Sequence, residues 1–120
     1  MDNSQSETES KIRSFASLPV GWDFGDGGPI SDAVIEKAID VLAACLPHDM
    51  ESNAFPGYDG ILLSFYGGSE HHDHCIDLDI QSDLSIDLTH DVGIGADYDT
   101  VEEIENVDLE TAKQRIASIA

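Results

Sequence analysis

The sequence predicts an α+β fold of two layers, with two N-terminal helices, an antiparallel sheet of three to four strands and a C-terminal helix. Two observations support this prediction. Apolar residues recur at helical spacing before residue 47 and after residue 108, and they alternate with polar residues from 75 to 89. At 120 residues the chain has the length of one domain. We therefore expect one α+β domain over residues 11–120, preceded by a disordered tail, residues 1–10.

The two N-terminal helices are expected between that tail and residue 47. The tail is polar and rich in serine, which is typical of a frayed terminus. Lys11–Leu18 can form a short helix that ends before Pro19, and a glycine-rich loop follows. Ser31 is a favourable N-cap for a longer helix, with Ile30 and Ile35 at the hydrophobic-staple positions around it. The apolar stripe of that helix consists of Ile35, Ala38, Ile39, Leu42 and Leu46.

The sheet is expected in the middle of the chain. His48–Gly60 is predicted as a loop, and the mostly apolar Ile61–Tyr66 as a central strand. Cys75–Ile80 and Leu84–Thr89 both alternate strictly, which predicts a hairpin. A three-residue loop, Gln81–Asp83, sets every apolar residue opposite another, whereas a two-residue loop would mix the two faces.

The last third of the chain is less regular until its final helix. Val92–Tyr98 either continues the second hairpin strand or begins another, and Val101–Val107 fits an edge strand or a helical turn. Asp108 is a cap for a last helix, Leu109–Ile119. The apolar face of that helix consists of Leu109, Ala112, Ile116 and Ile119.

The charge of the chain is strongly negative and uneven. It has 25 acidic and 5 basic residues, a formal net charge of −20. Between Ala38 and Ala112 there are eighteen Asp and Glu residues and no Lys or Arg. Like charges at this density oppose folding by self-repulsion, and a basic partner is the simplest explanation for them. Direct binding to nucleic acid or to an anionic membrane is not expected, because neutralising phosphates requires Lys and Arg.

The predicted hairpin gives these carboxylates an ordered arrangement. It sets Asp77 opposite Asp87 and Asp73 opposite Asp91, with Asp79 on the same face, and directly opposed side chains lie about 5 Å apart. This face is either a solvated surface that keeps the protein soluble or a preformed acidic docking surface, and a divalent-cation site is a third reading. A second acidic edge is predicted from Asp97, Asp99, Glu102, Glu103 and Glu105.

The segment from His71 to Cys75 suggests metal chemistry, but strand alternation separates its side chains. One side of the strand receives His72 and His74, and the predicted register places His90 opposite His74. His72, His74 and His90 therefore form an alternative metal site, although the spacing of a structural zinc site is missing.

The two cysteines indicate neither a disulfide nor a nucleophile. Cys75 lies among carboxylates and imidazoles, without the positive charge that would lower the pKa of its thiol, and Cys45 is expected in the core. The sequence also lacks a secretory signal and an apolar run long enough for a membrane span. These features favour a cytoplasmic protein without a cofactor.

One segment carries a resemblance. Leu18-Pro19-Val20-Gly21-Trp22-Asp23, the glycine-rich loop and Pro29-Ile30-Ser31 at the helix start resemble a group of small bacterial proteins of uncharacterised function. The resemblance covers about residues 18–66, departs from the group at Leu63-Ser64-Phe65-Tyr66, where a Leu-x-Trp is common, and implies no catalytic residues. By size and charge the chain is also similar to acidic inhibitors of bacteria and phages: immunity proteins, antitoxins and anti-CRISPR proteins that mimic DNA.

These observations favour a non-enzymatic, acidic protein-binding module or inhibitor. Its partner is expected to be a basic, nucleic-acid-binding protein, and its binding residues those of the acidic face and edge. The alternatives are a metal-binding domain or metallohydrolase that uses His72, His74 and His90, and a structural subunit whose charge serves solubility alone. The sequence specifies neither the partner nor an oligomeric state.

Overall fold

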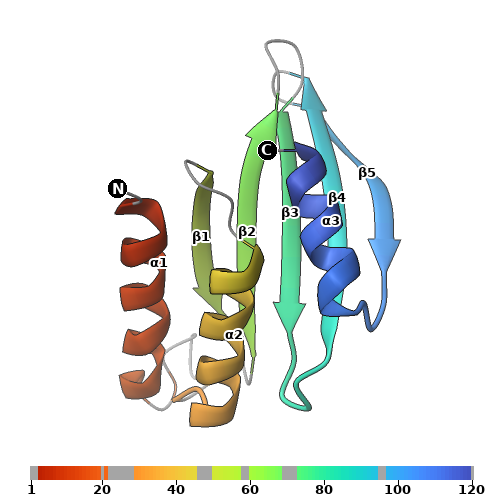
Figure 1. The fold of residues 1–120 in the computed structure, drawn as a ribbon. Helices are drawn as coiled ribbons and strands as arrows, with labels where there is room; N and C mark the ends of the chain where they lie inside the picture. The colour runs from red at the N-terminus through yellow and green to blue at the C-terminus, as the bar shows by residue number, and fades with distance from the viewer. Residues whose placement is uncertain are drawn as a thin grey trace.

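The computed structural model describes residues 3–19, 21, 29–45, 50–57, 60–68, 73–94 and 97–119, and Figure 1 shows their arrangement. The helices are α1 (Asn3–Ser14), α2 (Asp32–Cys45) and α3 (Leu109–Ile119), with a short 3-10 helix, η1 (Phe15–Ser17), after α1. The strands are β1 (Glu51–Pro56), β2 (Ile61–Gly68), β3 (Asp73–Ile80), β4 (Ile86–Ile94) and β5 (Asp97–Ile104).

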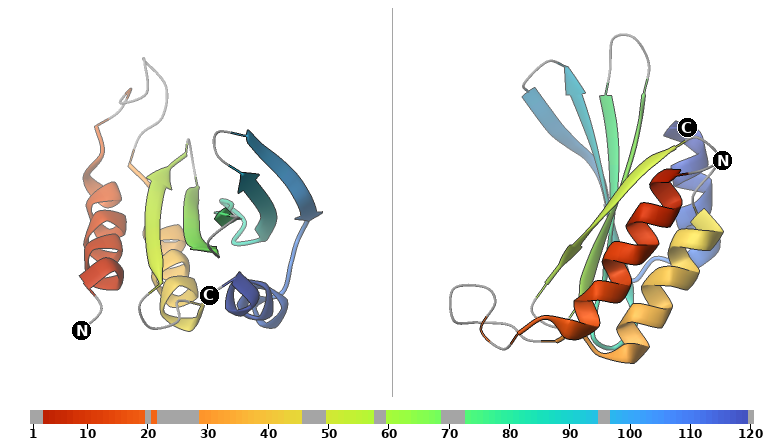
Figure 2. Two further views of the ribbon diagram at one scale, coloured as in Figure 1. Left: turned by 90° about the horizontal axis from the view of Figure 1, so that it is seen from above. Right: turned by 90° about the vertical axis from the view of Figure 1, so that its left-hand side faces the viewer.

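All five strands form one antiparallel sheet in chain order, and the helices lie on one side of it (Figure 2). Helix α1 packs along β1, whereas α2 and α3 pack on β2 and β3. The predicted two-layer α+β fold is confirmed, with five strands in place of three to four. No helix among the described residues is long and apolar enough to cross a membrane.

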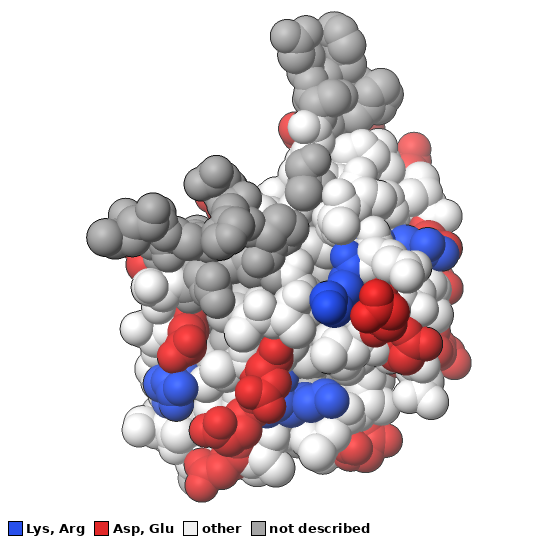
Figure 3. Space-filling model, in the orientation of Figure 1, with Lys and Arg blue, Asp and Glu red and all other residues white. Residues whose placement is uncertain are grey.

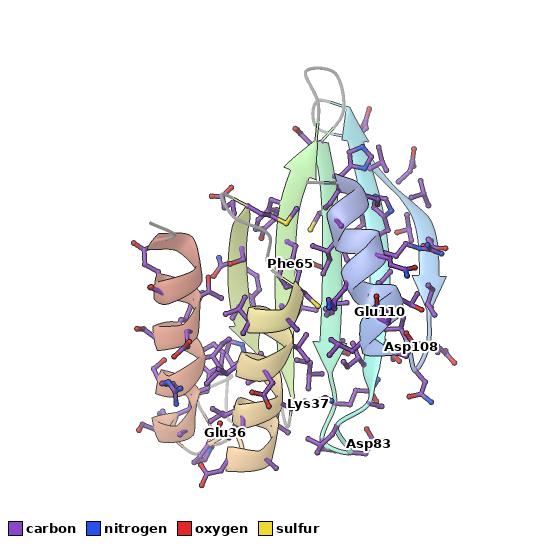
Figure 4. The ribbon with its side chains drawn as sticks, viewed as in Figure 1. Glu36, Lys37, Phe65, Asp83, Asp108 and Glu110 are labelled. Carbon is purple, nitrogen blue, oxygen red and sulfur yellow. The ribbon has the colours of Figure 1, made fainter. Side chains whose placement is uncertain are left out.

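The core lies between the helices and one face of the sheet. Phe65 of β2 is fully buried there and points toward the helices (Figure 4). Gly67, two residues on, allows a close approach between the two layers. A Cβ atom at Gly67 would lie 2.0 Å from the carbonyl oxygen of Ile119, so the end of α3 rests directly on the β2 backbone.

The prediction of a disordered tail was wrong for residues 3–10, which belong to α1. Two contacts hold this polar helix in place. Ile12 is fully buried, and the buried Thr8 hydroxyl lies 2.9 Å from the Ser52 hydroxyl of β1. Glu9 and Arg13 form an ion pair one turn apart. The helix depends on β1 for its place, which composition alone does not reveal.

Helices α2 and α3 begin where the sequence predicts. The Ser31 side-chain oxygen accepts a hydrogen bond from the Val34 N–H at 3.4 Å, and Ile30 is buried. Asp108 caps α3, accepting a hydrogen bond from the Thr111 N–H at 2.7 Å (Figure 4). Both caps satisfy backbone donors that the first helical turn leaves without partners.

Strand β1 lies inside the segment predicted as a loop, so the prediction for residues 48–60 was wrong where β1 runs. The inward residues of β1 are Ser52 and Ala54, which are small, and the outward ones include Asn53. Such a strand shows no apolar alternation, and its β-propensity is low. Pairing with β2 and packing against α1 stabilise it instead.

The hairpin between β3 and β4 has the predicted loop length but a different register. Ile80 pairs with Ile86, not Leu84, and Gln81 N–H donates to Ser85 at 2.9 Å. The loop is therefore residues 82–84, one position beyond the prediction. Leu84, expected to face the core, is 39% exposed and takes a positive φ of 72°. The face assignments survive because the loop keeps three residues.

The ambiguous segments near the C-terminus become strand. β4 continues the hairpin to Ile94, and β5 runs to Ile104 as the edge strand. The pairing of β5 with His90 and Asp91 of β4 contains a bulge, in which Val101 is skipped. The chain then turns at Asn106, which has a φ of 53°. Val107 is buried beneath this turn and donates its N–H to Ile86 at 2.7 Å.

Candidate functional site

The face of the sheet opposite the helices, here the open face, is the candidate functional site (Figure 2). Its side chains form four rows across the strands. The first row is Gly68, Asp73 and Gly93, and the second is Glu51, Tyr66, Cys75, Asp91 and Thr100. The third row is Asn53, Ser64, Asp77, Thr89 and Glu103, and the fourth is Phe55, Leu62, Asp79 and Asp87.

The structure brings all five predicted aspartates of the hairpin together on this face. Their pairing differs from the prediction because the loop is displaced. Asp77 lies opposite Thr89 and not Asp87, and Asp73 lies opposite Gly93 and not Asp91. Asp79 and Asp87 are the directly opposed carboxylates between β3 and β4. The arrangement therefore contains less close repulsion than the predicted one, since like charges directly opposite each other destabilise a sheet.

Neutral groups fix the orientation of several carboxylates on the open face. The Ser64 hydroxyl donates to Asp77 Oδ1 at 2.6 Å, and the Thr100 hydroxyl donates to Asp91 Oδ1 at 2.6 Å. These donors come from the neighbouring strands β2 and β5. They orient each carboxylate without cancelling its charge. A Lys or Arg at the same position would cancel it.

Asp87 receives two such hydrogen bonds. Gln81 Nε2 lies 2.5 Å from Asp87 Oδ2, and the Asn106 N–H donates to Asp87 Oδ1 at 2.8 Å. Both contacts fix the orientation of the Asp87 carboxylate, which lies directly opposite Asp79. The Asn106 contact also ties the turn after β5 to β4, so Asp87 has a structural role besides its charge.

The positive charges of the protein lie on the other side. All five Lys and Arg residues belong to helices, and Figure 3 shows both signs of charge intermingled on the helix side. Lys11 reaches the rim of the open face from α1. Its Nζ donates to Asn53 Oδ1 at 2.9 Å and lies 4.8 Å from the ring centroid of Phe55. On the open face, β3 and β4 thus present carboxylates, and no Lys or Arg of the described residues belongs to these strands.

The predicted second acidic edge divides between the two sides of β5. Glu103 belongs to the open face, in the row of Asp77. Glu102 lies on the helix side, where Arg115 of α3 donates to it at 2.6 and 3.1 Å and lowers the pKa of the carboxyl group. Asp97 and Asp99 are exposed on the edge strand, and Glu105 is exposed in the turn after it.

A pocket of about 650 Å³ opens at the second row. Its residues come from four strands: Glu51, Tyr66, Gly67, Gly68, Asp73, His74, Cys75 and Asp91. Glycines beside Asp73 leave the sheet surface hollow there, because they have no side chains to fill it. Tyr66 forms part of the wall, and the surrounding carboxylates make the pocket negative.

The pKa values of two side chains in the pocket are raised by that environment. Burial, then the charges of Asp77 and Asp91, raises the pKa of the Cys75 thiol to about 12. Burial raises the pKa of Tyr66 as well, and nearby Cys75, Asp77 and Glu51 add to it. Cys75 is therefore a protonated thiol at neutral pH, unsuited to nucleophilic attack. Cys45 is buried in the core, as expected, where burial raises its pKa to about 11.

The structure brings together two of the three histidines proposed as metal ligands. His74 and His90 lie on the helix side of the sheet, with His74 Nδ1 and His90 Nε2 3.0 Å apart, although His74 pairs with Val92. His72, and His71 beside it, lie outside the described residues. Among the residues described, no three His, Cys, Asp or Glu side chains are placed to hold a metal ion.

Several residues of the open face were missed by the sequence reasoning. Glu51 lay in a predicted loop, and Ser64 and Tyr66 in a strand expected to be apolar on both faces. Leu62, Ser64 and Tyr66 alternate with fully buried Ile61, Leu63 and Phe65, and the register with β3 places them on the open face, where Ser64 is also buried. That alternation was the available signal, although Leu62 and Tyr66 obscure it by being largely apolar.

Comparison with known proteins does not identify the chain: no family model, curated protein or solved structure matches it. The resemblance to the bacterial group stays a prediction. Most of the glycine-rich loop on which it rests, residues 22–28, lies outside the described residues.

Proposed function

We propose that this protein is a non-enzymatic binding module whose open face docks on the basic surface of a nucleic-acid-binding partner protein, in place of nucleic-acid phosphates. The observation that supports this proposal most is the segregation of charge. Asp73, Asp77, Asp79, Asp87 and Asp91 share one face of a hydrogen-bonded sheet, while every Lys and Arg belongs to a helix. Such a surface accelerates encounter with a basic partner and selects against acidic ones.

The neutral hydrogen-bond donors favour docking over solubility as the role of this face. A surface that serves solubility needs charge but no fixed orientation. Here Ser64 and Thr100 hold Asp77 and Asp91 at 2.6 Å while leaving them negative. A preoriented carboxylate loses less conformational entropy when a basic side chain binds it.

An apolar contact at one end of the face complements the charge. Phe55 lies opposite Leu62 in the fourth row, and Phe55 is 40% exposed. Burial of such groups supplies affinity in protein interfaces, whereas rim charges mainly set the rate of association and the specificity. The open face therefore offers both components of a binding surface.

The proposal is tested by binding of an oligo-arginine peptide to two charge-matched triple variants. The first, Asp77→Asn with Asp79→Asn and Asp87→Asn, removes three charges from the open face. The second, Glu36→Gln with Asp40→Asn and Glu110→Gln, removes three from exposed positions on α2 and α3 (Figure 4). We expect about tenfold weaker binding for the first variant than for the second, measured by titration calorimetry.

Two results would overturn the proposal. Equal weakening in both triple variants would mean that the peptide senses net charge and not the open face. Wild-type affinity that stays constant across a salt series would exclude a mechanism led by charge, because salt screens exposed ion pairs. Circular dichroism of each variant checks that the fold is retained.

A further inference from the structure

The pocket at the second row differs from the rest of the open face in combining an aromatic wall with carboxylates. Tyr66 stands between Glu51 on β1 and Cys75 on β3 in that row, and Asp91 follows on β4. Asp73 adds a carboxylate from the adjacent row. A cation entering the pocket would meet an aromatic side chain and carboxylates from three different strands.

We propose that this pocket receives an arginine side chain of the partner protein, an inference that rests on the proposed function. A guanidinium group is planar, so it can stack on the Tyr66 ring while its N–H groups donate to carboxylates around it. A lysine ammonium can approach the same carboxylates but lacks the planar stacking surface. The volume of about 650 Å³ admits a whole side chain together with the backbone that bears it.

Contacts within the protein prepare the pocket for a cation. The Thr100 hydroxyl holds Asp91 at 2.6 Å, which fixes one carboxylate before binding. The glycines beside Asp73 keep the floor free of side chains. The raised pKa values of Tyr66 and Cys75 agree with this geometry, because burial and negative charge both disfavour adding another anion.

The experiment compares oligo-arginine and oligo-lysine peptides of equal length on the wild type and three variants. Tyr66→Leu removes the ring, Tyr66→Phe keeps it, and Phe55→Leu removes an aromatic side chain at the far end of the open face, in the fourth row. We expect the wild type to prefer arginine about threefold, as one exposed cation–π contact predicts. Tyr66→Leu should lose that preference, while Tyr66→Phe and Phe55→Leu should retain it.

Chemical-shift mapping with a single-residue probe locates the site directly. N-acetyl-arginine methylamide, titrated into ¹⁵N-labelled wild type, should shift the amides of Gly67, Gly68 and Cys75 more than those of Asp79 and Asp87. The neutral citrulline analogue should leave all of them unchanged, because it keeps the shape of arginine without its charge.

The results separate the two proposals. Peptide binding without an arginine preference, or a preference that survives Tyr66→Leu, overturns the pocket assignment and leaves the docking face intact. Shifts centred on Asp79 and Asp87 also overturn the pocket assignment. Absence of binding by either peptide overturns both.

Discussion

At the scale of single residues, the environment of a side chain decides its chemistry more than its type does. Cys75 sits beside histidine and aspartate in the sequence, a combination found in catalytic sites, yet its thiol has a pKa of about 12. Burial and the Asp77 and Asp91 carboxylates cause that shift. The absence of neighbouring positive charge in the sequence predicts this outcome, because a thiolate needs a cation nearby.

The two histidines in contact make stability depend on pH. Burial and then repulsion from His74 lower the pKa of His90, and Arg115 also lowers it, while Glu102 and Asp91 oppose the change. The unfolded chain therefore binds a proton at His90 more readily than the folded one. We expect the free energy of unfolding to contain a contribution that is complete above the ordinary histidine pKa of about 6.5 and lost as pH falls from there through the lower pKa of folded His90.

The measurement is urea unfolding of the wild type and His90→Gln between pH 7.5 and pH 5.5. The wild type should lose more stability over this range than the variant, because glutamine does not titrate. Carboxylates that do not interact with His90 contribute to both proteins alike and cancel in the difference. If the free energies of unfolding of wild type and variant change in parallel with pH, protonation of His90 does not destabilise the folded state.

At the scale of elements, the sequence predicts the helices and strands whose pattern lies within their own residues. Helices α2 and α3 are predicted because caps and apolar stripes lie within them, and the faces of β3 and β4 because their alternation is strict. Strand β1 and helix α1 depend on each other through Thr8 and Ser52, 44 positions apart in the chain. Such a contact is tertiary, and neither segment shows a period of its own.

The register of the hairpin shows a second kind of limit. Pairing either Leu84 or Ile86 with Ile80 keeps apolar residues on one face, so alternation fixes the face but not the register. The turn decides between them. Asp83 Oδ1 accepts hydrogen bonds from the Ser85 N–H at 2.9 Å and the Ser85 hydroxyl at 2.6 Å, and Leu84 takes a positive φ. A three-residue hairpin loop ends on a residue with positive φ, and Leu84 takes that position with its N–H donating to the Gln81 carbonyl at 2.8 Å.

The contact between β2 and α3 gives a prediction for Gly67→Ala. The new Cβ would meet the Ile119 carbonyl oxygen at 2.0 Å, so α3 must move away from the sheet. We expect the substitution to destabilise the protein by about 1–3 kcal/mol, the range for overpacked sites. Gly57→Ala is the matched control, since its Cβ would lie 3.4 Å from the nearest atom. Urea unfolding compares them, and equal stability of the two variants would contradict this contact.

At the scale of the whole molecule, the sequence predicts the acidic face but not its boundary. The gap in basic residues between Ala38 and Ala112 spans every strand, so the sheet contains carboxylates but no Lys or Arg of its own. Which carboxylates belong to the helix side depends on the bulge at Val101, which reverses the faces of β5. Because of it, Glu102 lies on the same side as Asp99, three positions earlier, and meets Arg115. Alternation does not reveal a bulge, because one skipped residue reverses the faces beyond it.

The same segregation of charge predicts that added salt stabilises the protein. Asp77 and Asp79 are two positions apart on β3, about 7 Å along the strand, and Asp79 lies opposite Asp87. The Debye length falls from about 30 Å at 0.01 M salt to about 8 Å at 0.15 M, so salt screens such repulsion. We expect the Tm to rise by about 4 °C or more over this range of sodium chloride, equivalent to about 1 kcal/mol. The open-face triple variant should gain less than the wild type, because it carries less repulsion to screen, whereas the helix-side triple variant should gain nearly as much. A wild-type Tm that is unchanged or lowered by salt would mean that attractive ion pairs outweigh the repulsion on the sheet.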